Sequence, residues 1–314
     1  MSGGCSLLSD GSSMRITSRG RSCAVVGNGD DGGALPDPKG RKEAMAQDRA
    51  GWSKSEQKEL DSHKKNKSFE HINRSSVPDG RRLIKLIWVY KRKRDGSLKS
   101  RLCVQGCHQM PGVDYDQTWC GTMRSTSLRT LASIAAKRKL LMRRWDFSTA
   151  FLQGTLEKDE VVYCLPPPGY ETTGSDGRTK VVRVDKPIYG MAQAARRWQR
   201  DLFAWFESEG FTRCGADSCV FSKSEKIDGK TQKLLVGVYV DDLAVVYSDD
   251  GPNSLYSRFA ARLQSRWAVE DEGPVADLLN VQFESHSDGS FTLHQRNYID
   301  KLVERYLPCG AYPR

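Results

Sequence analysis

Asp241 and Asp242 close the tetrapeptide Tyr-Val-Asp-Asp in the middle of a strongly apolar stretch. Apolar runs rich in branched residues flank them, at residues 234–238 and 243–247, and short runs of this kind predict buried strands. Burying an ionised carboxylate is costly unless a cation or hydrogen bonds compensate its charge. The pattern therefore predicts a hairpin whose turn presents two carboxylates to a hard metal ion such as Mg²⁺, or else a solvated turn, in which Asp is common.

A further acidic residue, Asp146, lies near the end of a second strand-like run at residues 140–147. A tight turn or short helix is expected directly after it, at residues 148–154. Asp146 precedes Asp241 by 95 residues, so only the fold can bring them together. Carboxylates brought together in this way can hold two divalent ions, which activate an attacking oxygen and stabilise a leaving one in phosphoryl transfer. On local grounds, Asp146 could instead cap the following helix.

Three motifs occur in order along the chain: Trp145-Asp-Phe-Ser-Thr-Ala-Phe-Leu-Gln-Gly154, Ile188-Tyr-Gly-Met-Ala-Gln-Ala-Ala-Arg-Arg-Trp198 and Tyr239-Val-Asp-Asp-Leu243. They resemble the successive motifs of reverse transcriptases of copia-type LTR retrotransposons. Residues 112–118, 126–131 and 295–302 are similar to further segments of that family. The resemblance extends roughly from residue 80 to residue 307.

The resemblance implies an α+β fold shaped like a right hand, with fingers, a palm built on an antiparallel sheet, and a partial thumb from about residue 270. It implies DNA synthesis from dNTPs on a primed RNA or DNA template. Asp146 and Asp241 are expected to hold two Mg²⁺ ions, for which Mn²⁺ could substitute, and Asp242 to support this metal site. Such a polymerase is one part of a transposable-element polyprotein, whose ribonuclease H and integrase (the enzyme of DNA integration) are not expected within this chain.

The resemblance also assigns residues to the incoming nucleotide. Arg101, together with Lys99, is expected at the triphosphate, because a planar guanidinium can bind phosphate in bidentate fashion. Phe151 is expected under the sugar, where its ring would exclude a ribose 2′-hydroxyl; without the resemblance it would be read as an ordinary core residue. The remaining residues expected at the nucleotide pocket are Gly190, Gln193 and Tyr239.

Positive charge is concentrated in one short segment of a chain whose net charge is +10. Residues 81–105 carry nine basic side chains and one acidic one, whereas residues 106–314 carry 27 of each. Two strand-like runs, at 83–90 and 98–104, flank an Asp-Gly pair there, which predicts a basic hairpin. Such a hairpin favours contact with nucleic acid; a solvated hairpin or a nuclear-localisation-like signal is the alternative. The residues proposed for this contact are Lys91, Arg92, Lys93 and Arg94.

Residues 1–75 are rich in Gly, Ser and charge, and no apolar period is sustained there. Such a segment cannot bury enough apolar surface to offset its ordering entropy. It is predicted to be disordered apart from a short helix near residues 53–65, with the reverse transcriptase domain at residues 76–314. Within that domain the sequence predicts helices at 127–139, 192–209, 252–266 and 296–306, and further strands near 160–164, 180–184, 279–285 and 290–294.

The nine cysteines include no CxxC pair, and the N-terminus lacks the apolar region of a signal peptide. These features predict reduced thiols in an intracellular compartment, either the cytoplasm, within a virus-like particle, or the nucleus. No apolar run approaches the ~20 residues of a membrane span, so no membrane partner is expected; no pattern fixes an oligomeric state. Cys103, Cys107 and His108 form an incomplete zinc-like set, for which ordinary thiols are the alternative.

Departures from the family pattern leave two other functions open. Ala195 stands where the family usually has a proline, residues 119–122 replace a Phe-Ala-Pro-Val motif, and Gln105 replaces a frequent basic residue. One alternative is a decayed or domesticated protein that binds nucleic acid without polymerising. The other is a different two-metal phosphotransferase, such as a nuclease or cyclase.

Overall fold

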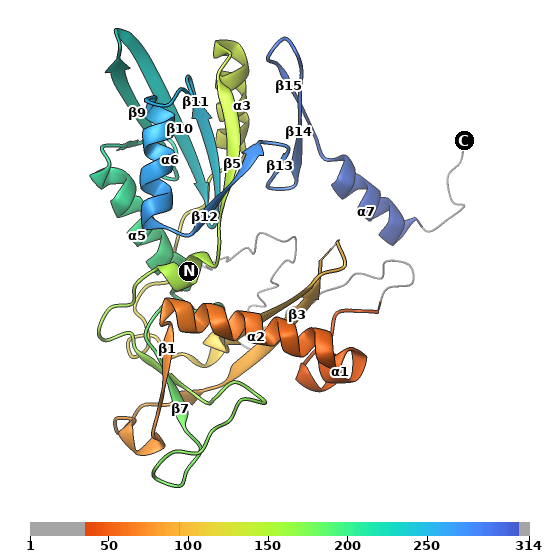
Figure 1. Cartoon of the computed structure of the whole chain (residues 1–314), viewed down its shortest axis with the longest axis vertical. Helices are drawn as coiled ribbons and strands as arrows, with labels where there is room; N and C mark the ends of the chain where they lie inside the picture. The colour runs from red at the N-terminus through yellow and green to blue at the C-terminus, as the bar shows by residue number, and fades with distance from the viewer. Residues whose placement is uncertain (1–34, 94, 308–314) are drawn as a thin grey trace. The chain divides into compact units, whose positions relative to one another are not determined.

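The computed structural model describes residues 35–93 and 95–307, and the chain divides into two compact units (Figure 1). Unit 1 comprises residues 1–120 and 149–203, and unit 2 comprises residues 121–148 and 204–314. Each unit contains both helices and largely antiparallel sheet. The predicted α+β class is therefore confirmed.

Unit 1 contains a four-stranded sheet with the strand order β1-β7-β6-β2. The strands β2 and β6 are parallel, and the other pairs are antiparallel. Val162, Val182 and Val184 are fully buried and form the core of this sheet. Its strands are β1 (Phe69–Ile72), β2 (Leu83–Ile84), β6 (Val162–Cys164) and β7 (Val181–Val184).

The basic segment forms the predicted hairpin, made of β3 (Leu86–Arg92) and β4 (Leu98–Val104). Its register runs from Leu86 opposite Val104 to Arg92 opposite Leu98. The long helix α2 (Arg49–Asn66) packs along β4. The helices of unit 1 are α1 (Arg41–Gln47), α2 (Arg49–Asn66), α4 (Ala150–Gln153) and the first part of α5 (Ala194–Ser208), with 3-10 turns η1 (Arg74–Ser76) and η2 (Gly106–His108).

The prediction of disorder is wrong for residues 35–52 and 66–75, which form α1, the ends of α2 and β1. The helix predicted near residues 53–65 lies within the longer α2. Residues 1–34 lie outside the described part of the chain. Asp48 caps α2 by accepting a hydrogen bond from the backbone N–H of Gly51. The buried side chains of α2 are Trp52, Glu56, Glu59 and His63. Because three of the four are polar, no apolar period marks this helix in the sequence, although its spacing is that of one helix face.

Unit 2 contains a six-stranded sheet with the strand order β12-β5-β11-β10-β9-β8. All of its strand pairs are antiparallel, and β5 lies between β11 and β12. Every residue of β11 is buried, since both faces of the sheet are covered there. The strands are β5 (Leu141–Phe147), β8 (Thr212–Arg213), β9 (Val220–Ile227), β10 (Lys230–Tyr239), β11 (Asp242–Tyr247) and β12 (Val269–Pro274).

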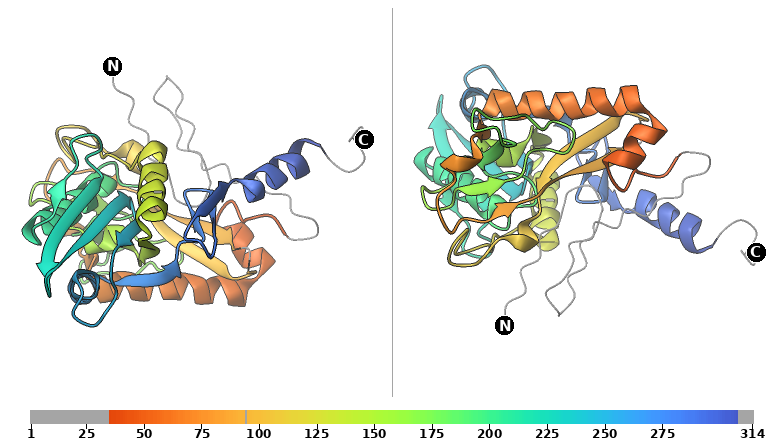
Figure 2. Two further views of the ribbon diagram at one scale, coloured as in Figure 1. Left: turned by 90° about the horizontal axis from the view of Figure 1, so that it is seen from above. Right: turned by 90° about the horizontal axis from the view of Figure 1, so that it is seen from below.

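Two helices, α3 (Ser125–Arg138) and α6 (Leu255–Arg266), cover opposite faces of this sheet (Figure 2, left). On the α3 face, a Cβ atom added to Gly237 of β10 would lie 2.3 Å from Sδ of Met123 and 2.9 Å from Leu131, so a larger residue there would force these side chains to move. On the α6 face, the ring of Tyr256 stacks on Tyr247 of β11 with a centroid distance of 3.8 Å. Adjacent residues of β11 therefore face different helices, and Asp242 shares the α3 face with Ala244.

The last elements of unit 2 are a small three-stranded sheet and a C-terminal helix. They are β13 (Asp277–Leu278), β14 (Val281–Ser285), β15 (Phe291–His294) and α7 (Arg296–Tyr306). The two longer strands and α7 agree with the sequence-based prediction. The strands β8, β9, β12 and β13 of this unit were not predicted.

Candidate active site

The predicted hairpin turn joins β10 to β11, where Tyr239 pairs with Asp242 across a loop of two residues, Val240 and Asp241. Val240 has a φ of +56°, which is rare for a β-branched residue. Backbone conformations of this kind cost about 1–3 kcal/mol and gather at functional sites. The backbone carbonyl of Asp241 accepts a hydrogen bond of 2.9 Å from the N–H of Phe147, so the turn is fixed to the end of β5.

The fold brings the third predicted carboxylate to this turn. In the register between β11 and β5, Asp146 lies opposite Asp242. The two side chains therefore lie on the same face of the sheet, next to the turn that carries Asp241. Asp242 is buried and Asp146 is half-buried. The structure thus places Asp146 beside Asp241 and Asp242, although it precedes Asp241 by 95 residues in the sequence.

The carboxylates raise one another's affinity for protons. Burial, followed by the charges of Asp241, Asp242 and Glu272, raises the pKa of Asp146 from 3.8 to about 7. Burial also raises the pKa of Asp242 to about 6, although the charge of Arg144 lowers it. The charge density here is unfavourable in the protein alone, and a cation would relieve it.

Arg144 is a basic residue within this acidic site that the sequence analysis did not identify. It donates hydrogen bonds from Nε and Nη2 to Oδ1 of Asp242 at 2.9 and 2.8 Å, and its Nη1 lies 3.1 Å from Glu272. Arg144 precedes Asp146 by two positions on β5, and residues so spaced on a strand share a face. That spacing was the available signal. The guanidinium holds one oxygen of Asp242 in place.

The donor set suits a divalent ion of the Mg²⁺ type. Within residues 35–93 and 95–307, no group of three or more His, Cys, Asp or Glu side chains is arranged to hold a metal by itself. Mg²⁺, however, usually takes only one or two carboxylates and completes its shell with waters and substrate phosphates. Asp146 and Asp241 fit that pattern, whereas Oδ1 of Asp242 already accepts hydrogen bonds from Arg144.

The zinc-like set does not form a metal site in the described part of the chain. Sγ of Cys107 lies 3.5 Å from Nδ1 of its neighbour His108. Burial raises the pKa of Cys103 to about 12, and zinc binds the thiolate form. Burial therefore holds Cys103 in its thiol form.

Two of the residues predicted at the nucleotide, Arg101 and Phe151, contact Tyr189 in unit 1. The guanidinium of Arg101 lies over the Tyr189 ring, 4.9 Å from its centroid. The ring of Phe151 lies 4.8 Å from that of Tyr189. Tyr189 thus links two residues expected at opposite ends of a nucleotide. It belongs to the second motif of the resemblance, but no role had been assigned to it.

Gly190 and Gln193 have roles within the protein. Gly190 has a φ of +86°, and a Cβ atom there would lie 2.2 Å from the carbonyl oxygen of Val104 at the end of β4. Gln193 is fully buried; its amide donates to the carbonyl of Asp114 and accepts from Gln109. The close backbone approach predicted at Gly190 therefore exists, but it is made to β4. The predicted nucleotide contact of Gln193 stays a prediction.

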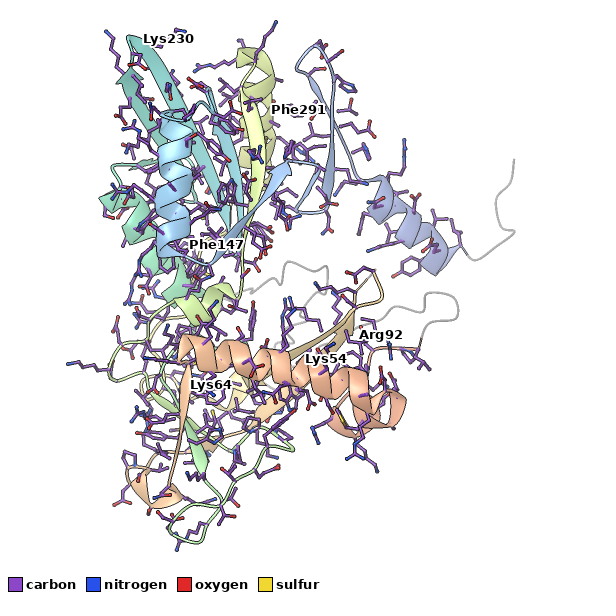
Figure 3. The ribbon with its side chains drawn as sticks, viewed as in Figure 1. Lys54, Lys64, Arg92, Phe147, Lys230 and Phe291 are labelled. Atoms are coloured by element: carbon purple, nitrogen blue, oxygen red, sulfur yellow. The ribbon has the colours of Figure 1, made fainter. Side chains whose placement is uncertain are left out.

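The basic hairpin is less available to a partner than its sequence suggests. Arg92, at the end of β3 (Figure 3), donates a hydrogen bond to Gln47 and lies over the Trp52 ring at 5.4 Å. Lys91 is half-buried and Lys93 is exposed. Arg94 lies outside the described residues. Among the described residues that were predicted to contact nucleic acid, Arg92 therefore packs against the protein.

None of the helices that the structure describes has the length and apolar character needed to cross a bilayer.

The family model described as reverse transcriptase (RNA-dependent DNA polymerase) matches residues 69–314. The chain therefore belongs to this reverse transcriptase family, and the resemblance to the copia-type retrotransposon enzymes is confirmed. Membership implies dependence on a divalent metal ion in general terms.

The relatives are polyproteins of transposons. The retrovirus-related Pol polyprotein from transposon TNT 1-94 of Nicotiana tabacum is 30% identical over 266 residues, which cover 83% of this chain and 19% of that protein. The polyprotein from transposon RE1 of Arabidopsis thaliana is 33% identical over 231 residues, or 72% of this chain and 15% of that protein. The chain thus spans less than a fifth of the length of these relatives.

A solved structure is also similar to the chain. It is described as the foamy viral protease-reverse transcriptase dRH in complex with ds DNA. The alignment covers 83% of this chain and 37% of that one, with 15% identity and a TM-score of 0.44.

Proposed function

We propose that this chain catalyses DNA synthesis directed by an RNA or DNA template, transferring a nucleotide from a dNTP to the 3′-hydroxyl of a primer. The observation that carries the proposal is the register that sets Asp146 opposite Asp242, beside the strained turn at Asp241. Membership of the reverse transcriptase family supports the same reaction.

The carboxylates would act by holding divalent cations. We assign Asp146 and Asp241 as ligands of two Mg²⁺ ions, or of Mn²⁺ in their place. Bound ions of this kind lower the pKa of an attacking hydroxyl and neutralise charge on the leaving group. Asp242 supports the site, because the Arg144 guanidinium fixes one of its oxygens and orients the start of β11.

Unit 1 would supply the contacts to the nucleotide. Arg101 binds the triphosphate, with Lys99 beside it on β4, since a guanidinium matches phosphate geometry. Phe151 lies under the sugar and excludes a 2′-hydroxyl, and Tyr189 supports both Phe151 and Arg101 through ring contacts. Tyr239, which directly precedes the proposed catalytic turn, is assigned to the nucleotide as well.

The primed template would contact the exposed lysine of the basic hairpin, Lys93, and its half-buried neighbour Lys91. Phosphate contacts release counterions, so binding should weaken steeply with salt. The site of action within the cell, in the cytoplasm within a virus-like particle or in the nucleus, stays a prediction.

Primer extension on an RNA template with dNTPs and Mg²⁺ tests the proposal. Asp241→Asn should reduce incorporation by several orders of magnitude while circular dichroism stays unchanged, because the amide keeps the shape of the carboxylate and loses its charge. Asp288→Asn is the matched control, since its side chain bonds only within an exposed turn in the structure described. Full activity of Asp241→Asn would refute the metal role. A wild-type chain that binds primer–template tightly without extending it would instead be a nucleic-acid-binding descendant.

A further inference from the structure

The helix α2 presents a polar face to the protein and a basic face to solvent. Lys54 and Lys64 project from its exposed side (Figure 3). Glu56 and Glu59, by contrast, are buried within unit 1. Carboxylates with so little exposure persist only where hydrogen bonds or charges compensate them. Their partners therefore show what α2 holds in place.

Two side chains of α2 bond to the backbone of β4. The hydroxyl of Ser55 accepts a hydrogen bond of 2.8 Å from the N–H of Ser100 and donates one of 3.1 Å to the carbonyl of Leu98. Oε1 of Glu59 accepts a hydrogen bond of 3.2 Å from the N–H of Leu102. Residues 98, 100 and 102 alternate along β4, and alternate backbone groups of an edge strand point away from its paired strand. The side chains of α2 thus replace a third strand on the free edge of β4.

A third side chain fixes α2 to the opposite strand of the hairpin. Glu56 accepts hydrogen bonds from the hydroxyls of Tyr90 on β3, at 2.5 Å, and of Tyr170, at 3.0 Å. Arg41 of α1 donates to the same carboxylate at 3.2 Å. Both strands of the hairpin are therefore tied to the one helix face.

Two of the three β4 residues bound by α2 flank Arg101. Ser100 and Leu102 are buried on the side of α2, so Arg101 between them points to the other side, where it meets Tyr189. The end of β4 is fixed as well, because the N–H of Val104 donates to the carbonyl of Tyr189 at 2.8 Å. A shift of β4 at residues 100–102 would therefore displace the guanidinium relative to Tyr189.

We propose that Ser55 and Glu59 are positioning residues for nucleotide binding: they fix β4 so that Arg101 is held in place for the triphosphate. This inference rests on the proposed function, which places Arg101 at the triphosphate. Both residues precede residue 69, where the family match begins, so the match assigns them nothing. The nucleotide site of this chain thus extends into a helix that its sequence alone does not mark as part of the enzyme.

The test compares four variants of the full chain with the wild type. Ser55→Ala and Glu59→Ala remove the acceptors, whereas Ser55→Thr and Glu59→Gln retain an oxygen in each place. We measure the KM and kcat for dNTP incorporation, the binding of a fluorescent dNTP, and hydrogen exchange of the Ser100 and Leu102 amides. Since a net hydrogen bond is worth about 1 kcal/mol, each alanine variant should raise KM and the dNTP dissociation constant about five- to tenfold. The kcat should change less than twofold, and Ser55→Thr and Glu59→Gln should restore both constants.

Ser68→Ala is the matched control for a general loss of stability. The Ser68 hydroxyl is buried just beyond the end of α2, but it bonds to His63 instead of β4. It should lower the melting temperature without raising KM. If Ser68→Ala raises KM as much as Ser55→Ala, or if the amides of β4 exchange faster while dNTP binding is unchanged, the positioning role is wrong.

The readouts also separate the two proposals. A wild-type chain that binds the fluorescent dNTP but does not incorporate it would refute the proposed polymerase activity, and the Ser55→Ala binding measurement would still decide the inference. A wild-type chain that does neither would overturn both. Because Ser55→Ala removes a single oxygen, it provides the decision if Glu59→Ala fails to fold.

Discussion

Replacing Asp146 with asparagine should stabilise the metal-free protein at neutral and higher pH. Burial and the neighbouring carboxylates raise the pKa of Asp146 from 3.8 to about 7. Each factor of ten in proton affinity corresponds to about 1.4 kcal/mol, so the full difference would be about 4 kcal/mol. Asp146 is only half-buried, and solvent screening reduces such values. We therefore expect Asp146→Asn to increase the free energy of unfolding by about 2 kcal/mol at pH 8.

The sign of the pH dependence follows from the direction of the pKa change. Between pH 3.8 and about 7 the folded chain binds the Asp146 proton more tightly than the unfolded chain does, so folding is disfavoured as the pH rises. The gain from Asp146→Asn should thus be below about 1 kcal/mol at pH 4.5 and reach its full size above pH 7. Urea unfolding in EDTA, followed by tryptophan fluorescence at both pH values, measures it. Added Mg²⁺ should then stabilise the wild type and have little effect on Asp146→Asn.

Asp217→Asn is a control with the opposite sign. Burial by itself would raise the pKa of Asp217. The pKa is nevertheless held below its usual value by hydrogen bonds from the Ser127 hydroxyl and from the backbone N–H groups of Arg124 and Cys219. Its carboxylate stabilises the fold above the unfolded-state pKa, and this contribution is lost as the pH falls through the folded-state value. Asp217→Asn should therefore destabilise the protein at pH 8. If Asp146→Asn also destabilises it at pH 8, the reasoning about like charges at the catalytic turn is wrong.

Two further predictions concern unit 1. Gly190→Ala should prevent unit 1 from folding, because the added Cβ atom would lie 2.2 Å from the Val104 carbonyl oxygen. The control Gly177→Ala also has a positive φ but open space around it, and it should lower the free energy of unfolding by only about 1 kcal/mol. Thermal unfolding compares the two variants, and equal melting temperatures would contradict the packing argument. Phe151→Ala should admit ribonucleotides, which is measured as the ratio of kcat/KM for dNTP and NTP. Unchanged sugar selectivity would refute the role of Phe151 in excluding the 2′-hydroxyl. Because Phe151→Ala also removes the contact with Tyr189, the less drastic variant Phe151→Leu is measured beside it.

The proposed catalytic carboxylates show how much of the site local sequence patterns can predict. The continuous apolar runs on both sides of Asp241 and Asp242 were enough to predict a buried hairpin, and the structure has this hairpin as β10 and β11. The pairing of Asp146 with Asp242 was predicted only from the resemblance to a family, because strands distant in sequence carry no local sign of their partner. The register between β5 and β11 depends on packing between helices on both faces of the sheet.

The helix α2 was predicted only as a short, isolated helix near residues 53–65, because hydrophobic periodicity was the wrong signal for its full length and its packing. Its buried positions recur at the spacing of one helix face, but Glu56, Glu59 and His63 occupy them with Trp52. A helix whose buried side chains are polar needs particular partners, such as the hydroxyl of Tyr90, and these partners lie elsewhere in the chain. The high charge content of residues 1–75 was a misleading sign of disorder for the same reason, since it counts the buried acids and the exposed lysines of α2 together.

Arg144 reduces the net negative charge that bound cations would have to neutralise at the proposed catalytic site. With their side chains ionised, Asp146, Asp241, Asp242 and Glu272 carry four negative charges, and Arg144 carries one positive charge, which leaves a net charge of −3. One divalent ion would leave −1 and two would leave +1, an excess that the phosphates of a nucleotide can neutralise. A second ion is therefore favoured mainly when it arrives with a polyphosphate, which matches the usual binding of Mg²⁺ through one or two carboxylates and substrate phosphates.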